Sequence, residues 1–69
     1  MEFKIFTVYN SKAEYFRTPM FIPSRGEALR GWIDIVNKPD NDYSRHPADF
    51  TLFEIGEFDS VTGCIRMLS

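Results

Sequence analysis

The chain has 69 residues, a net charge of −2, 43% hydrophobic residues, one cysteine and one histidine. This length gives a single domain, residues 1–69, and one cysteine excludes an internal disulfide. One cysteine and one histidine also cannot make a structural zinc site. A domain this small buries only about 60% of the surface of its unfolded chain, so we expect oligomerisation to add stability.

The sequence contains no candidate membrane span. No apolar run approaches the roughly 20 residues of a spanning helix, and no signal-peptide pattern opens the chain. We therefore expect a cytosolic protein with no membrane partner. The acidic balance lacks the basic excess of a typical duplex-DNA binder, so a nucleic-acid role would need a local basic patch.

Residues 2–9 predict a strand with two apolar faces, Phe3, Ile5, Thr7 and Tyr9 on one and Lys4, Phe6 and Val8 on the other. Such a strand is typical of the centre of a sheet that is covered on both sides. Residues 10–12 are turn formers, and residues 14–22 predict the return strand of a hairpin. Because Pro19 cannot donate to a strand ladder, this second strand should lie at an edge.

Residues 25–37 show the clearest helical pattern. Ser24 and Glu27 form a capping-box motif, in which the serine oxygen accepts a first-turn N–H and the glutamate bonds back to the cap. Pro39 disfavours helix at the preceding residue. Gly31 costs about 1 kcal/mol relative to alanine, which predicts a close backbone approach. The expected apolar stripe consists of Ala28, Leu29, Trp32, Ile33 and Val36.

Residues 38–49 are a long polar connection with a helical turn expected from Pro47. Residues 50–58 predict a third strand, again with apolar side chains on both faces, because Leu52, Glu54 and Phe58 alternate with Thr51, Phe53, Ile55 and Glu57. Residues 59–63 are turn formers, and residues 64–68 predict a short last strand.

This element order predicts an α+β fold, a two-layer ββαββ arrangement with an antiparallel sheet of order 2-1-3-4 and one helix packed on one face. One helix covers only one face of such a sheet. The other apolar face would therefore be uncovered in a monomer, and a second copy is the simplest cover. We predict a homodimer whose interface is formed by Phe6, Val8, Leu52 and Phe58, or by their equivalents on the opposite face.

Few residues suggest chemistry. His46 and Asp49 could form a base and its carboxylate partner, although a hydrogen-bonded loop histidine is favoured. The acidic run 40–42 lacks the glycine and glutamate of a calcium loop. Cys64 is interpreted as a small buried hydrophobe, and simple alternation puts Glu54 and Glu57 on opposite faces. We therefore expect no catalytic residue, no metal and no cofactor, that is, a protein that is not an enzyme.

The first hairpin combines aromatic rings with cations, a mixture typical of proteins that bind single-stranded nucleic acids. The candidate nucleic-acid-binding residues are Tyr9, Lys12, Tyr15 and Arg17. An ordinary exposed hairpin with tyrosines at its ends is the simpler alternative, and the sequence leaves both open.

Several stretches together resemble a known family: residues 18–21 (TPMF), 26–30 (GEALR) with Val36 and Asn37, 46–59 (HPADFTLFEIGEFD), and Thr62 with Gly63. They are similar to the small non-structural protein of the gokushoviruses, single-stranded DNA phages of the family Microviridae. The match covers nearly the whole chain. The resemblance implies a non-virion protein, made in the infected bacterium and associated with viral DNA replication and DNA binding.

The resemblance and the hairpin predict a non-enzymatic homodimer that binds single-stranded DNA in the host bacterial cytoplasm. The alternative is a protein–protein module that binds or redirects a host replication protein, which suits the acidic balance better. Salt-dependent DNA binding distinguishes the two.

Overall fold

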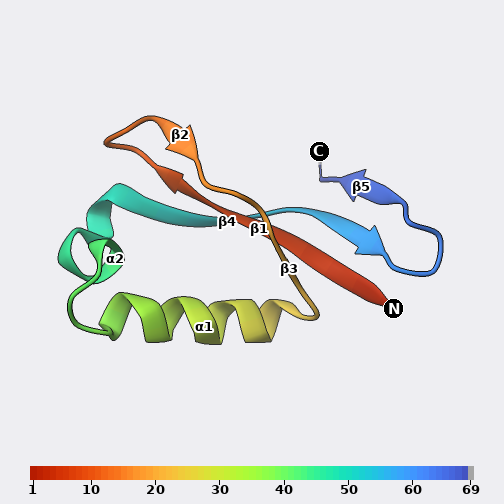
Figure 1. The fold of residues 1–69 in the computed structure, drawn as a ribbon, viewed down its shortest axis with the longest axis horizontal. Helices are drawn as coiled ribbons and strands as arrows, with labels where there is room; N and C mark the ends of the chain where they lie inside the picture. The colour runs from red at the N-terminus through yellow and green to blue at the C-terminus, as the bar shows by residue number, and fades with distance from the viewer. Residues whose placement is uncertain (69) are drawn as a thin grey trace.

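The computed structural model describes residues 1–68 and has one helical layer against one curled antiparallel sheet (Figure 1). This α+β arrangement confirms the predicted fold class. The elements in chain order are β1 (Glu2–Asn10), β2 (Tyr15–Phe16), β3 (Met20–Ile22), α1 (Arg25–Asn37), α2 (Asp42–Arg45), the 3-10 turn η1 (Pro47–Asp49), β4 (Phe50–Asp59) and β5 (Ile65–Met67).

The sheet order is β2-β1-β4-β5, and β3 pairs with β1 on the same edge as β2. This is the predicted order 2-1-3-4, with the expected return strand divided into two short pieces. The division falls at residues 17–19, where Pro19 has no N–H to donate. The Arg17 N–H still donates to the carbonyl of Val8 at 2.8 Å, so the edge remains attached across the gap.

A β-bulge in β4 decides which side chains share a face. Ile5 pairs with Gly56 while Phe6 pairs with Glu54, so Ile55 is an additional residue with no partner on β1. An inserted residue reverses the face of every side chain beyond it. Simple alternation along residues 50–58 was therefore wrong beyond residue 54.

Two expectations change because of the bulge. Phe58 pairs with Phe3 and lies on the face of Phe53, not on the face of Leu52. Glu57 pairs with Lys4, so Glu54 and Glu57 lie on the same face rather than on opposite faces.

Helix α1 covers one face of the sheet and leaves the other open, as Figure 1 shows. Beneath the helix, Phe6 and Val8 are only 2% and 3% exposed. We call this the covered face, and the opposite one the open face. In the registers of the strands, every charged strand residue lies on the covered face: Glu2, Lys4, Glu54, Glu57, Asp59 and Arg66.

Helix α1 has the predicted bounds, and the Ser24 hydroxyl oxygen accepts from the backbone N–H of Glu27 at 3.2 Å. The reciprocal bond of the capping box is not formed among residues 1–68. The predicted stripe is only partly correct, because Ala28 is buried whereas Leu29 and Ile33 are about half exposed. The helix turns Gly31 and Ile35 toward the sheet instead.

The connection after α1 contains more structure than expected. Asn41 caps the short helix α2 through its side chain, which accepts from the backbone N–H of Ser44 at 2.9 Å, and Ser44 completes a capping box. The turn expected at Pro47 is confirmed as η1. Both elements return the chain from the end of α1 to the start of β4.

Candidate functional site

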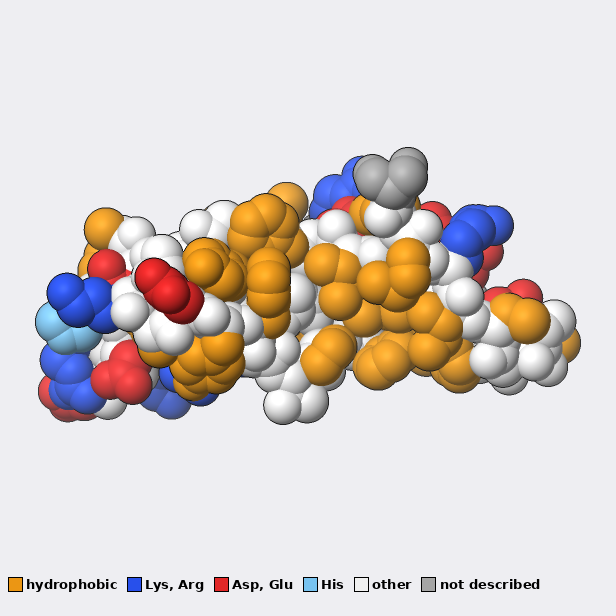
Figure 2. All heavy atoms as spheres, turned by 90° about the horizontal axis from the view of Figure 1, so that it is seen from above, with side chains coloured by type: hydrophobic (Ala, Val, Ile, Leu, Met, Phe, Trp, Pro, Cys, Tyr) orange, Lys and Arg blue, Asp and Glu red, His pale blue; other side chains and the backbone are white. Residues whose placement is uncertain are grey.

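The strands carry no charged side chain on the open face, and its hydrophobic side chains form two groups along the sheet (Figure 2). Figure 2, which looks down on the side opposite α1, shows hydrophobic atoms over most of its length. Its prominent side chains are between 42% and 61% exposed: Phe16, Phe21, Phe53, Ile65 and Met67. A patch of this kind on a small protein usually marks a contact surface.

Aromatic rings pack on one another within the open face. At one end the ring of Phe16 lies 4.7 Å from Tyr9 and 6.0 Å from Phe53, measured between ring centroids. At the other end Phe58 lies 6.3 Å from Phe3 and 5.6 Å from Phe21. These contacts restrict the orientations of the exposed rings.

The residues predicted as an interface are divided between the two faces. Phe6 and Val8 belong to the core of the chain itself and cannot reach a partner, and Leu52 lies beneath α1 beside them. Phe58 lies on the open face because of the bulge at Ile55. The surface that remains available is thus the opposite-face set, which the sequence left as the alternative.

The four residues predicted to bind nucleic acid do not form one cluster. Tyr9 lies on the open face, where it packs on Phe16. Lys12 is exposed in the turn that follows β1. Tyr15 pairs with Asn10, which places it on the covered-face side at the end of the sheet. Arg17 extends to that same side.

Arg17 is held by aromatic rings rather than by a carboxylate. Its guanidinium carbon lies 5.2 Å from the centroid of the Tyr43 ring and 5.8 Å from that of Phe50. The two rings are themselves 4.7 Å apart. Its Nε atom is buried without a hydrogen-bond partner, and Arg17 forms no ion pair among residues 1–68. No carboxylate among residues 1–68 therefore neutralises its charge.

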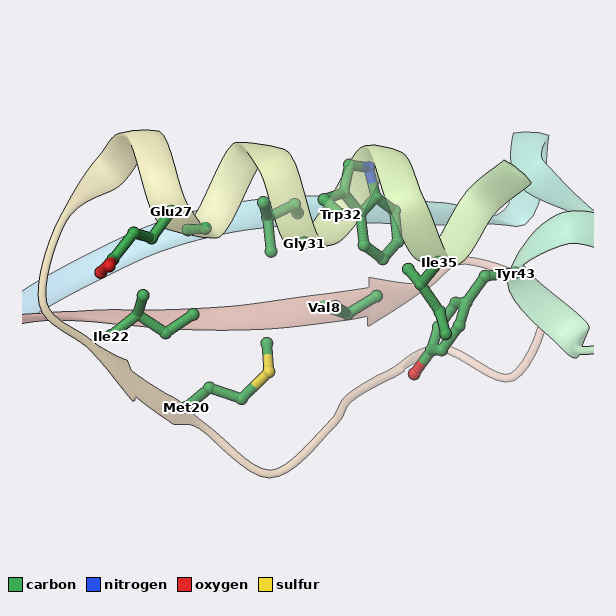
Figure 3. A pocket seen from close by; sticks show the side chains of 10 residues that line it. Val8, Met20, Ile22, Glu27, Gly31, Trp32, Ile35 and Tyr43 are labelled. Atoms are coloured by element: carbon green, nitrogen blue, oxygen red, sulfur yellow. The ribbon is translucent and has the colours of Figure 1, made fainter. Parts of the chain in front are cut away.

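A cavity of about 280 Å³ lies between α1 and the sheet. Figure 3 shows Trp32 and Ile35 entering it from the helix, Val8 from β1, and Met20 and Ile22 from β3. The lining is almost entirely apolar. Sequence patterns could not reveal this space, because it depends on how far the helix is held from the sheet.

Glu27 is the one charged residue in the cavity lining. Its carboxylate points toward Ile22 at one end of the cavity, and the hydroxyl of Tyr43 lies toward the other end (Figure 3). Within the described chain the Glu27 carboxylate has neither an ion-pair nor a hydrogen-bond partner. The sequence assigned it to the capping box, and its place in the cavity was missed.

Two carboxylates of the covered face, Glu54 and Glu57, are paired with cations. Arg25 binds Glu54 through two nitrogens, Nε to Oε1 at 2.6 Å and Nη2 to Oε2 at 3.1 Å. This hydrogen bonding lowers the pKa of Glu54. Glu57 accepts from Lys4 at 3.0 Å and also from Arg66, and these bonds lower the pKa of Glu57. Neither carboxyl group is suited to act as an acid at neutral pH.

The other candidate groups have structural surroundings. His46 lies between α2 and η1, and its backbone N–H donates to the carbonyl of Asp42 at 2.9 Å. Cys64 is exposed, which corrects the expectation that it is buried. Among residues 1–68, no three or more His, Cys, Asp or Glu side chains are grouped as metal ligands would be.

The geometry describes a small α+β protein with an uncharged open sheet face, an aromatic-bound cation and an apolar cavity. The chain belongs to the phage ORF5 protein family, whose model matches residues 3–69. It is thus a phage protein. No curated protein and no solved structure shows significant similarity to it. In the described part of the chain, no helix has the length and apolar character needed to cross a membrane.

Proposed function

We propose that the protein is a non-enzymatic component of single-stranded DNA replication in a phage of the Microviridae, and that it binds single-stranded DNA as a homodimer in the host bacterial cytoplasm. Membership of the phage ORF5 family and the sequence resemblance to gokushovirus non-structural proteins support the biological setting. The contact with DNA rests on the geometry at one end of the sheet.

The observation that supports DNA binding most directly is the state of Arg17. Its guanidinium lies against Tyr43 and Phe50 and has no carboxylate partner within residues 1–68. Single-strand binders combine such cations, which contact phosphate, with aromatic side chains on which bases stack. The exposed ring of Tyr15 lies at the same end of the sheet and on the same side, and Lys12 lies at the adjoining turn.

The open face supports the dimer rather than the DNA contact. It is aromatic, but none of the charged residues of the strands lies on it, so it offers no partner to phosphate. Each of its five prominent side chains is about half exposed. Since a large side chain of this kind buries about 150–250 Å² when it is fully covered, the five together expose roughly 500 Å². A second copy that covers this area and its rim approaches the ~800 Å² per partner of a stable interface.

The proposal is tested by titrating fluorescent oligothymidine with the protein at several low salt concentrations. A dimer that presents Lys12 and Arg17 twice neutralises about four phosphates, which gives a slope of log K against log salt near −3. We expect Lys12→Gln/Arg17→Gln to weaken binding at least fivefold. Arg66→Gln removes a cation that is already paired with Glu57 and should change binding little.

Two results would contradict the DNA proposal. One is the absence of binding by the wild-type protein even at the lowest salt concentration. The other is equal binding by the wild-type protein and by Lys12→Gln/Arg17→Gln. Thermal unfolding of the same variants shows whether a loss of binding reflects loss of fold, since Arg17 also packs on Tyr43 and Phe50.

A further inference from the structure

We propose that the cavity beneath α1 is a docking site for an apolar side chain of a partner protein, and that this side chain is followed in the partner by lysine or arginine. The site lies apart from the open face and does not depend on DNA binding. Three features of the cavity support it: its size, the glycine in its wall and the charge at its end.

The size of the cavity fits a large side chain. An apolar cavity of about 150 Å³ remains dry and admits benzene. The space beneath α1 measures about 280 Å³ and is lined by side chains such as Val8, Ile35 and Leu52. It can therefore accept an aromatic ring or a branched aliphatic side chain. Met20, which is partly exposed in its wall, can adjust to different shapes.

Gly31 is otherwise unexplained. Glycine is among the least favourable residues in a helix interior, and it usually occurs there because another part of the chain approaches closely. A Cβ atom built on Gly31 would meet nothing within 4 Å, so no such approach exists among residues 1–68. Gly31 lines the cavity, and the absence of a side chain there keeps that part of the cavity open.

The charge of the cavity selects the class of partner. Glu27 places an unpartnered carboxylate at one end, and Arg17 lies beyond Tyr43 rather than in the lining. This carboxylate repels phosphate and acidic segments, and it attracts a cation next to the docked side chain. A protein segment with an apolar residue beside a basic residue satisfies both conditions, whereas a nucleic acid carries phosphates, which the carboxylate repels, in place of the cation.

The test uses two peptides that differ only in charge, acetyl-Leu-Trp-Lys-Lys-amide and acetyl-Leu-Trp-Glu-Glu-amide, added to the whole protein and followed by backbone amide NMR. We expect the basic peptide to shift the amides of Val8, Ile22 and Gly31, and the acidic peptide to bind at least tenfold more weakly. Glu27→Gln should reduce this preference, and Glu27→Lys should reverse it.

Substitutions that fill the cavity test the proposal independently of charge. Gly31→Leu should weaken peptide binding at least tenfold while its melting temperature is no lower than that of the wild type, because the added side chain enters open space. Gly31→Ala should give a smaller loss. Gly26→Ala is the matched control, since Gly26 lies on the same helix outside the cavity and should leave binding unchanged.

Several outcomes would overturn the proposal. These are the absence of shifts with both peptides, equal binding of the two peptides, and undiminished binding by a folded Gly31→Leu. Oligothymidine that shifts the cavity amides, and loses this effect in Gly31→Leu, would assign the cavity to nucleic acid instead. We expect DNA binding through Lys12 and Arg17 to persist in Gly31→Leu. One of the two proposals can therefore be contradicted while the other holds.

Discussion

The two faces of the sheet are built from the same strands and differ in chemistry. The covered face combines the buried side chains Phe6 and Val8 with all the charged residues of the strands. The open face has rings and aliphatic side chains and no charge. A solvated sheet face normally carries polar residues. The inverted distribution in this chain supports the proposal that the open face is the surface through which two copies associate.

The bulge at Ile55 produces this separation. Without the additional residue, Phe58 would lie beneath the helix layer and Glu57 would lie among the rings of the open face. With it, Glu57 faces Lys4 across the strands and Phe58 packs on Phe3 and Phe21. This one additional residue thus places Glu57 with the other charged strand residues and Phe58 with the rings of the open face.

The largest effect is expected from Phe6→Ala on the covered face. Phe6 is 2% exposed, and removal of a buried phenylalanine costs about 3–5 kcal/mol. A core of this size supplies roughly 3–5 kcal/mol in total. The variant should therefore be unfolded at room temperature, as measured by circular dichroism and by the dispersion of amide resonances. A well-dispersed spectrum would show that the covered face is not the core.

Phe53→Lys on the open face should separate association from folding. Phe53 is 42% exposed, so the monomer should remain folded while self-association weakens at least tenfold, which corresponds to about 1.4 kcal/mol. Sedimentation equilibrium measures this change. Val61→Lys introduces the same charge at an 82% exposed turn residue and should leave association unchanged. A wild-type protein that is monomeric at micromolar concentration would contradict the dimer itself.

Local patterns were sufficient to predict the main elements. The helix bounds follow from the cap at Ser24 and the breaker at Pro39, and the sheet order follows from the doubly apolar strands and from Pro19. The bulge could not be predicted, because an inserted residue is recognised only from the register between two strands. Helix α2 is too short for a hydrophobic period to reveal it.

The candidate sites were less accessible to sequence reasoning. Tyr9, Lys12, Tyr15 and Arg17 are close in sequence, but strand alternation and the turn distribute them over both sides of the sheet. The rings that hold Arg17 come from Tyr43 and Phe50, which are distant along the chain. Such contacts, like the cavity beneath α1, depend on tertiary packing that no local pattern encodes.

Gly56→Ala tests the packing at Gly56, the residue at which regular pairing between β4 and β1 resumes after the bulge. A Cβ atom at residue 56 would lie 2.7 Å from the backbone oxygen of Arg66, a clash that a backbone atom cannot easily relieve. We expect a loss of about 1–3 kcal/mol in the free energy of unfolding, as for other overpacked sites, and weaker protection of the β4–β5 amides from hydrogen exchange. Gly31→Ala, in open space, should instead stabilise the chain by about 1 kcal/mol. Equal effects of the two substitutions would contradict the described packing.

The smallest effect concerns acid. Hydrogen bonds from Arg25 lower the pKa of Glu54, and hydrogen bonds from Lys4 and Arg66 lower the pKa of Glu57, both from an ordinary value of 4.5. The backbone N–H of Val61 similarly lowers the pKa of Asp59. Groups with a lowered pKa in the folded state stabilise it above their unfolded pKa, and this contribution is lost as the pH falls through the folded pKa.

The melting temperature should accordingly be nearly constant from pH 7 to about 5.5 and should fall below about pH 4.5, where the unfolded chain binds more protons than the folded one. Glu57→Gln should flatten part of this fall. Because these three carboxylates stay ionised between pH 7 and about 5.5 and also lie on the covered face, dimerisation through the open face should not change over this range. Sedimentation equilibrium over this range checks the second half of the prediction. A dissociation constant that changes steeply while the fold is intact would place ionisable groups in the interface, and the open face would then not be the surface through which the chains associate.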